Sequence, residues 1–205
     1  MLEVTNLDCV RGDRKLFADI NMSLKPGTFL QLQGANGSGK TSLLRILSGL
    51  LAPARGEVRW QGANIRSLGE DYSTAVTYIG HRSAVKEELT CLENHRINNG
   101  LAGVEVTKEE ALETLGRMGL AGREHLPARL LSEGQRRRLA LSRLLSSSTH
   151  LWLLDEVLTS LDRAGVTLIT SVIETHLKSG GVAVVATHQE LNLAAGCFER
   201  LQLTS

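Results

Sequence analysis

The sequence predicts an α/β fold built around a mainly parallel β-sheet. Two runs, residues 151–154 and Val182–Ala186, are continuously apolar, and segments with helical spacing separate them. Continuously apolar strands that alternate with helices are typical of a parallel sheet covered on both faces. A glycine-rich segment between an alternating strand at 29–33 and a following helix is the third sign of this fold class.

The elements follow in order along the chain. Residues 1 to about 80 read as short strands, such as 29–33 and 57–60, which are interrupted by one helix at about 41–50. From about 87 to 120 the apolar residues take helical spacing. A basic helix to about 147, a strand at 151–154, a helix from about Arg163 and a strand at Val182–Ala186 complete the pattern. We therefore predict one α/β domain over residues 1–205.

Composition and charge exclude several classes of protein. Lys and Arg number 23 against 22 Asp and Glu, so the net charge of +1 gives no bulk attraction to nucleic acid or anionic lipid. The apolar stretches are far shorter than the roughly 20 residues of a membrane-spanning helix. The first residues lack the pattern of a secretion signal, and Cys9, Cys91 and Cys197 form no C-x-x-C pair. We expect reduced, structural thiols and a cytosolic location.

The glycine-rich segment at 34–41 carries the strongest chemical signal. It matches the pattern G-x-x-x-x-G-K-[ST] between a strand and a helix, where backbone N–H groups point at phosphate oxygens. Lys40 would reach the β- and γ-phosphates of a nucleotide, and Thr41 would offer its hydroxyl to Mg²⁺. The alternative is a glycine-rich turn without a ligand. The residues predicted to bind nucleotide here are Gly34, Asn36, Gly37, Ser38, Gly39, Lys40, Thr41 and Ser42.

Two acids and one histidine follow the buried strands. Asp155 and Glu156 come directly after residues 151–154, and His188 comes two residues after Ala186. Because ligands collect at the carboxyl ends of such strands, all three are expected near the phosphates. Asp155 would hold Mg²⁺ and Glu156 would act as general base on the attacking water. His188 would contact the γ-phosphate and act with Lys40 in catalysis. The alternatives are solvated acids at a strand end and a surface or core histidine.

A second small-residue turn opens the basic helix at residues 131–135. Its sequence, Leu-Ser-Glu-Gly-Gln, is followed by three arginines and would present free N–H groups to an anion. Because one phosphate loop already exists at 34–41, Ser132, Gly134 and Gln135 are predicted to face the ATP of a partner subunit. The alternative is an ordinary N-capped basic helix.

Together these segments resemble, in order and spacing, the ATP-binding subunit of an ABC transporter. The matching residues are 34–41, 131–135, 151–156, 160–162 and 187–188, so the resemblance covers almost the whole chain. It implies a P-loop NTPase of the ABC ATPase type: an α/β domain with an antiparallel β-subdomain and a small helical subdomain, at about 87–145, that carries the signature loop. In that family residues 131–135 are the signature loop, 160–162 the D-loop at the dimer seam, and His188 the switch histidine.

Within the family, several stretches look like the ATP-binding subunit of the bacterial haem exporter of cytochrome c maturation. They are residues 9–17, 37–45, 79–81, 86–94 and 151–156. The resemblance implies ATP and Mg²⁺ as cofactors, membrane-spanning transporter subunits as partners, and self-association as an ATP-sandwich homodimer. It also implies a peripheral position on the cytoplasmic face of the bacterial inner membrane, with indirect membrane contact and no nucleic-acid partner.

Four positions depart from the family pattern. Arg11 stands about where most members stack an aromatic ring on adenine, and its flat guanidinium can stack in that place. His81 or Arg82 takes the position of a Gln that serves Mg²⁺ or water, and a one-residue shift decides which; His81 is the predicted metal-site residue. Val157 stands where Pro is common, and Glu133 replaces a signature-loop Gly.

The sequence therefore predicts an ATPase subunit that dimerises around two ATP molecules and drives separate membrane subunits. One alternative is the ATPase of an exporter for another small substrate or a lipid. A soluble ABC-type ATPase acting on DNA or ribosomes would show a long insert, a second cassette or a basic tract, and none is visible. A clamp that binds ATP without turnover would be favoured by a missing base, but Glu156 is present.

Overall fold

The computed structural model describes residues 1–81, 84–189, 191, 193–194 and 196–204 and divides into two compact units. The first unit comprises Met1–Gly80, Thr149–Glu156 and Ile173–Ser205, and the second comprises His81–Ser148 and Val157–Val172. Helix α8, Arg163–Lys178, contributes to both units. An inserted subdomain with bounds at about 87–145 stays a prediction.

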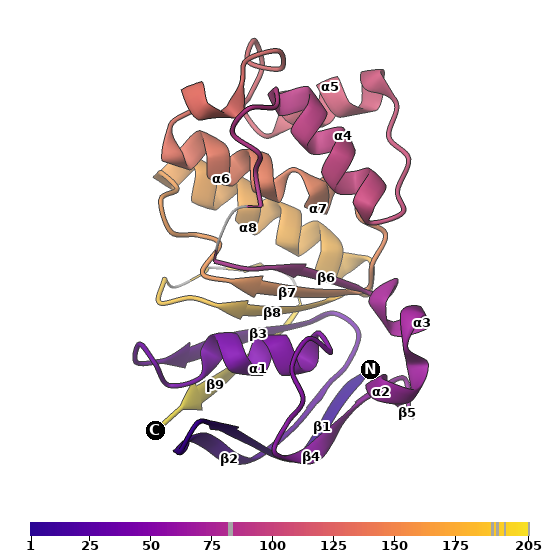
Figure 1. Ribbon diagram of the computed structural model, residues 1–205, viewed down its shortest axis with the longest axis vertical. Helices are drawn as coiled ribbons and strands as arrows, with labels where there is room; N and C mark the ends of the chain where they lie inside the picture. The colour runs from indigo at the N-terminus through magenta and orange to yellow at the C-terminus, as the bar shows by residue number, and fades with distance from the viewer. Residues whose placement is uncertain (82–83, 190, 192, 195, 205) are drawn as a thin grey trace. The chain divides into compact units, whose positions relative to one another are not determined.

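A five-stranded parallel sheet forms the centre of the first unit (Figure 1). Its order is β6-β7-β8-β3-β9, and every neighbouring pair is parallel. All residues of β7 and β8 are buried, which is the reason for their continuously apolar sequences. The predicted α/β fold class is confirmed. The strands are β3 Thr28–Gly34, β6 Val76–Ile79, β7 Leu151–Asp155, β8 Val182–Ala186 and β9 Cys197–Leu203.

An antiparallel sheet of order β2-β1-β4-β5 belongs to the same unit. Helix α1, Lys40–Leu47, lies between the two sheets (Figure 1). Its buried Leu43, Leu44 and Leu47 join a core that includes residues of both sheets. The helix that follows the glycine-rich loop is thereby fixed from two sides. The strands are β1 Leu2–Arg11, β2 Arg14–Leu24, β4 Arg55–Trp60 and β5 Ala63–Asn64.

Three predictions about the first unit need correction. Helix α1 ends before the predicted residue 50, because Gly49 takes a left-handed φ of +79°. Two one-turn helices, α2 Ile65–Leu68 and α3 Glu70–Ser73, interrupt a region predicted as strands with one helix. The Asn64 side chain starts α2 by accepting a hydrogen bond from the Arg66 amide at 3.0 Å. Strand β9 was not predicted, because charged residues interrupt its apolar sequence.

The second unit is helical and has its own core. Capping boxes at Thr90–Glu93 and Thr107–Glu110 start two of its helices. Cys91, Ala111, Leu115, Leu120 and Leu139 are among the residues that pack into this core. The helices are α4 Cys91–Leu101, α5 Lys108–Arg117, η1 Ala128–Leu130, α6 Glu133–Leu141 and α7 Arg143–Ser146.

The basic helix predicted to run to about residue 147 is in fact two helices. The break falls at Ser142, which is buried between α6 and α7. The Ser142 hydroxyl donates to the carbonyl of Leu139 at 2.7 Å, and the same oxygen lies 2.7 Å from Nδ1 of His95 on α4. A buried polar contact with a neighbouring helix therefore accompanies the break, and sequence periodicity does not show it. No helix in the described part of the chain has the length and apolar character needed to span a membrane.

Two buried histidines make the stability of the fold dependent on acid. Burial lowers the pKa of His95 and of His176 from 6.5 to about 4. Between pH 6.5 and about pH 4 these histidines are protonated in the unfolded chain but neutral in the folded protein. We therefore expect the free energy of unfolding to be highest above pH 6.5. It should fall by up to about 3 kcal/mol per histidine as the pH is lowered to 4.

Urea unfolding measured across this pH window checks the prediction. His176 stacks on Trp152 with ring centroids 3.8 Å apart, so His176→Phe keeps the stack and removes the titrating group. That variant should lose less stability on acidification than the parent. His125→Phe is the control, because His125 is exposed. If the parent and His176→Phe lose the same free energy of unfolding on acidification, His176 does not contribute to the pH dependence of stability.

Candidate active site

The glycine-rich loop joins β3 to α1 as the sequence predicted. Gly34, Gly37 and Gly39 have φ values of +152°, +82° and +103°, a region that residues with side chains rarely adopt. A Cβ atom on Gly34 would lie 2.4 Å from Oγ of Ser38, and one on Gly39 would lie 2.9 Å from the ring of Phe17. Both positions therefore require glycine for space as well as for backbone conformation.

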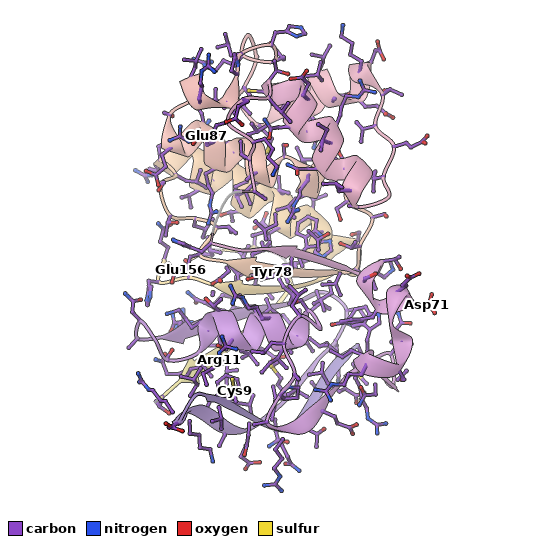
Figure 2. All side chains as sticks on the ribbon, viewed as in Figure 1. Cys9, Arg11, Asp71, Tyr78, Glu87 and Glu156 are labelled. Atoms are coloured by element: carbon purple, nitrogen blue, oxygen red, sulfur yellow. The ribbon has the colours of Figure 1, made fainter. Side chains whose placement is uncertain are left out.

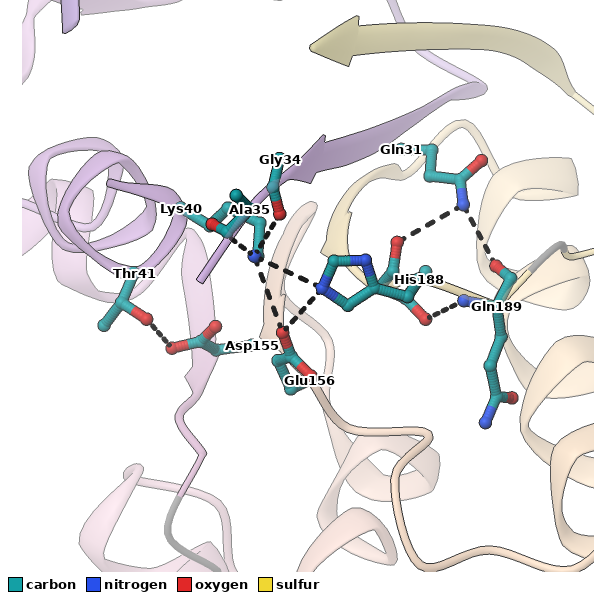
Figure 3. Close-up of polar contacts among 10 residues, drawn as sticks. Gln31, Gly34, Ala35, Lys40, Thr41, Asp155, Glu156, His188 and Gln189 are labelled. Carbon is teal, nitrogen blue, oxygen red and sulfur yellow. Dashed lines mark hydrogen bonds and ion pairs between the residues drawn. The ribbon is translucent and has the colours of Figure 1, made fainter. Parts of the chain in front are cut away.

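Lys40 lies at the centre of the site (Figure 3). Its ammonium donates to the carbonyl oxygens of Gly34, at 2.7 Å, and Ala35, at 3.3 Å. Nζ also lies 3.4 Å from Nε2 of His188 and 3.8 Å from Oε1 of Glu156. The side chain is 7% exposed, so its charge is held over the loop in a largely desolvated position.

Glu156 and His188 come together at the carboxyl edge of the parallel sheet. Oε1 of Glu156 lies 3.7 Å from Nε2 of His188 (Figure 3). Glu156 has a left-handed φ of +54°, which costs a residue with a side chain on the order of 1–3 kcal/mol. Its N–H donates to the carbonyl of Ala186 at 2.9 Å. The three residues predicted to be catalytic, Lys40, Glu156 and His188, thus lie within 4 Å of one another.

Thr41 and Asp155 form a second contact at the same edge. The Thr41 hydroxyl donates to Oδ2 of Asp155 at 2.8 Å, and Asp155 is 1% exposed. A buried carboxylate beside a hydroxyl is an oxygen donor set of the kind that Mg²⁺ prefers. These two residues fit the metal site that the sequence predicted.

The loop also fits a phosphate group. Oγ of Ser38 is buried and has no hydrogen-bond partner within the described residues. Helix α1 has no side-chain cap at its N-terminus, and a helix start of this kind favours an anion. Asn36 and Gly37 are exposed at the rim of the loop. The loop therefore offers a phosphate group a buried hydroxyl and a helix start without a side-chain cap.

Gln31 supports His188 and was not predicted. This side chain lies in β3 and is fully buried. Its Nε2 donates to the backbone carbonyls on either side of His188, those of Thr187 at 3.4 Å and Gln189 at 3.0 Å. The available signal was an amide between Leu30 and Leu32 in a buried strand, since a buried polar group requires a partner.

Arg11 and Ser42 also belong to the first unit. Arg11 ends β1 and is exposed, and Figure 2 labels it together with Cys9 of the same strand. Burial raises the pKa of the Cys9 thiol, while a hydrogen bond with Ser42 and the charge of Arg11 act in the opposite direction. Cys9 is therefore buried, as expected of a structural thiol, but it also contacts a residue of the predicted ATP site. The stacking role of Arg11 stays a prediction.

The segment at 131–135 starts α6 in the second unit. Oγ of Ser132 accepts from the amide of Gln135 at 3.2 Å, and the Gln135 side chain accepts from the amide of Ser132 at 3.0 Å. The expectation of free N–H groups is thus wrong for these two amides, because the capping box occupies them. Glu133 accepts from the hydroxyl of Ser160 at 2.5 Å, and a Cβ on Gly134 would lie 2.8 Å from the Ser160 carbonyl.

His81 also belongs to the second unit. Its backbone carbonyl accepts a hydrogen bond from Arg137 at 3.0 Å, and its side chain is exposed. Arg82, the other residue considered for this position, lies outside the described residues. A metal-site role for the His81 side chain stays a prediction.

Comparisons with known proteins agree with this arrangement. The ABC transporter family model matches residues 17–159. The chain is 55% identical over 99% of its length to the cytochrome c biogenesis ATP-binding export protein CcmA of Nitrosospira multiformis, covering 98% of that protein. Its fold is similar to that of an ABC transporter ATP-binding protein from Pyrococcus furiosus, with a TM-score of 0.82 and 23% identity over 98% of this chain and 96% of the other.

A second solved structure, a bacterial ABC transporter cassette described as dimeric, has a TM-score of 0.81 and 23% identity over 98% of this chain and 94% of its own. At this identity the two solved structures support the fold. The family model and the full-length relative support membership. The chain therefore belongs to the ABC transporter family, as an ATP-binding subunit related over its whole length to the cytochrome c biogenesis export proteins.

Proposed function

We propose that this chain hydrolyses ATP to drive an exporter that serves cytochrome c biogenesis. The observation that carries the chemical part is the meeting of Lys40, Glu156 and His188 beside the Thr41–Asp155 contact. The observation that carries the biological part is 55% identity to a full-length relative with that role in its name.

Each residue of the site has a separate role in the proposed hydrolysis of ATP. The backbone of the loop and the Lys40 ammonium hold the phosphates, so the γ-phosphate lies next to Lys40 and close to Glu156. The Glu156 carboxylate takes the proton of the attacking water as general base. His188 holds a γ-phosphate oxygen, and Gln31 fixes the backbone on both sides of His188. Arg11 stacks on the nucleotide base through its guanidinium.

Mg²⁺ fits at Thr41 and Asp155 of the first unit. When bound, the metal supplies charge neutralisation on the phosphate oxygens. The Asp155 carboxylate accepts a hydrogen bond from the Thr41 hydroxyl at 2.8 Å. This bond holds the carboxylate and the hydroxyl side by side at the edge of the sheet.

A homodimer with ATP at its seam completes the site. Ser132, Gly134 and Gln135 at the start of α6 face the nucleotide of the partner copy. With the capping box formed, Ser132 acts through its hydroxyl proton and Gly134 through its backbone. The Ser160 hydroxyl donates a hydrogen bond to the Glu133 carboxylate. This bond partly offsets the negative charge of Glu133 near a phosphate.

Membrane-spanning subunits of the haem export complex are the proposed partners. The chain would attach to them at the cytoplasmic face of the bacterial inner membrane, with indirect lipid contact. The near-neutral net charge of +1 agrees with a protein that binds neither nucleic acid nor an anionic surface by bulk attraction.

The test is the content of c-type cytochromes in the bacterium that carries this gene. Lys40→Ala, or deletion of the gene, should abolish holo-cytochrome c and leave haem synthesis and haem b proteins intact, because the block lies after haem is made. Lys25→Ala is the control, since Lys25 is exposed and lies outside the loop at 34–41. Normal c-type cytochromes together with the loss of another transport activity would favour an exporter of a different small substrate or lipid.

A further inference from the structure

Arg137 is a buried arginine that contacts two separate segments of backbone. It lies on α6 and is 5% exposed. Its Nε donates to the carbonyl of Val157 at 3.1 Å, and its Nη1 donates to the carbonyl of His81 at 3.0 Å. A planar guanidinium with donors in a fixed fork is suited to hold two acceptors at a set separation.

The two acceptors occupy special places in the chain. His81 and Val157 are the residues at which the chain passes from the first unit into the second, after Gly80 and Glu156. Each follows a strand of the parallel sheet by two residues, β6 in one case and β7 in the other. One side chain therefore ties together the two segments that leave the sheet for the helical unit.

Glu156 lies between two fixed points of its own backbone. Its N–H is bound to Ala186 on β8, and the carbonyl of the next residue is bound to Arg137. A non-glycine residue keeps a left-handed φ, here +54°, only when its surroundings hold it there. The hydrogen bonds to Ala186 and from Arg137 hold the backbone of Glu156, the proposed base, in this conformation.

We propose that Arg137 is a positioning residue that sets the backbone of Glu156 for hydrolysis, while the same guanidinium also binds the carbonyl of His81. This inference rests on the proposed function of Glu156. The contact of Arg137 with the Val157 carbonyl lies beside the proposed base, whereas the glycine-rich loop and Lys40 are the proposed phosphate-binding groups. We therefore expect the loss of Arg137 to lower the rate of the chemical step and to leave ATP affinity unchanged.

The decisive variant is Arg137→Met, which keeps the apolar stem and removes all five donors. We expect kcat for ATP hydrolysis to fall by about tenfold to a hundredfold, as is typical when a catalytic group shifts by about 1 Å. The dissociation constant for ATP should stay within about twofold of the parent value, since ordinary mutational scatter is of this size. Arg117→Met, an exposed arginine of the same unit, is the control and should behave as the parent.

A double variant separates positioning from simple support of the fold. Single-turnover hydrolysis is measured for Arg137→Met, Glu156→Gln and the two combined. If Arg137 acts through Glu156, its substitution adds little to the loss already caused by Glu156→Gln. Full additivity of the two losses, or a parental kcat in Arg137→Met, would overturn the proposal. Parental hydrolysis by Glu156→Gln would instead remove the general-base assignment itself.

Thermal unfolding of each variant is recorded in parallel. If Arg137→Met does not fold, Arg137→Gln takes its place, because its shorter amide reaches only one of the two carbonyls. An intermediate kcat with unchanged ATP affinity then supports the proposal, and a parental kcat contradicts it.

Discussion

Replacing Glu156 with glutamine is expected to lower the rate of ATP hydrolysis about 10²–10⁴-fold, the range typical of a positioned general base. The amide keeps the size and hydrogen-bonding capacity of the carboxylate but cannot accept the proton of the attacking water. ATP binding should persist, because Lys40 and the loop are unchanged. The ATP-bound dimer should therefore last longer and be visible by size-exclusion chromatography in the presence of ATP.

Phosphate release from the purified protein measures this rate. Glu70→Gln is a matched control, since Glu70 is exposed in the same unit. Hydrolysis at the parental rate by Glu156→Gln would show that another group takes the proton. Asp155→Asn provides a contrast: it should change the Mg²⁺ concentration needed for activity, because Asp155 is the proposed metal-site carboxylate.

Lys40→Ala should weaken ATP binding by about one to two orders of magnitude without unfolding the protein. A hydrogen bond from a charged donor contributes roughly 1.5–3 kcal/mol, and about 1.4 kcal/mol corresponds to a tenfold change in affinity. In the structure the ammonium binds the loop carbonyls of Gly34 and Ala35 rather than any group of the hydrophobic core. Removing the ammonium should therefore weaken phosphate binding at the loop and leave the stability of the fold largely unchanged.

Titration with a fluorescent ATP analogue measures the loss, and thermal unfolding confirms that the variant is folded. Lys25→Ala removes an exposed lysine of the same unit and should bind the analogue as the parent does. Unchanged affinity in folded Lys40→Ala would rule out phosphate binding by this residue.

Strong local patterns allowed much of the fold to be predicted. Strand β8 has the bounds that its apolar run predicts, and β7 extends its own run by Asp155. These strands are readable because burial on both faces leaves no polar position inside them. The loop at 34–41 was equally clear, since its pattern depends on a strand before it and a helix after it.

What the sequence did not reveal depends on contacts between distant residues. Helices α2 and α3 are too short to show a period. The contacts of Arg137 join residues 20 and 56 positions apart, and those of Gln31 join residues 156 and 158 positions apart. Local spacing carries no information about partners so far along the chain, so Arg137 was read only as part of a basic helix.

The strand order has a consequence for the synthesis of the protein. Strand β3, which leads into the ATP loop, is made well before β8 and β9, its only neighbours in the described sheet. Until residues 182–203 leave the ribosome, this almost fully buried strand has no partner on either edge. The growing chain therefore exposes an apolar, unpaired strand that is prone to aggregate and that chaperones acting on nascent chains can cover. Glu156 and His188 reach the loop only after β8 has been added, because β8 joins β7 to β3 in the sheet.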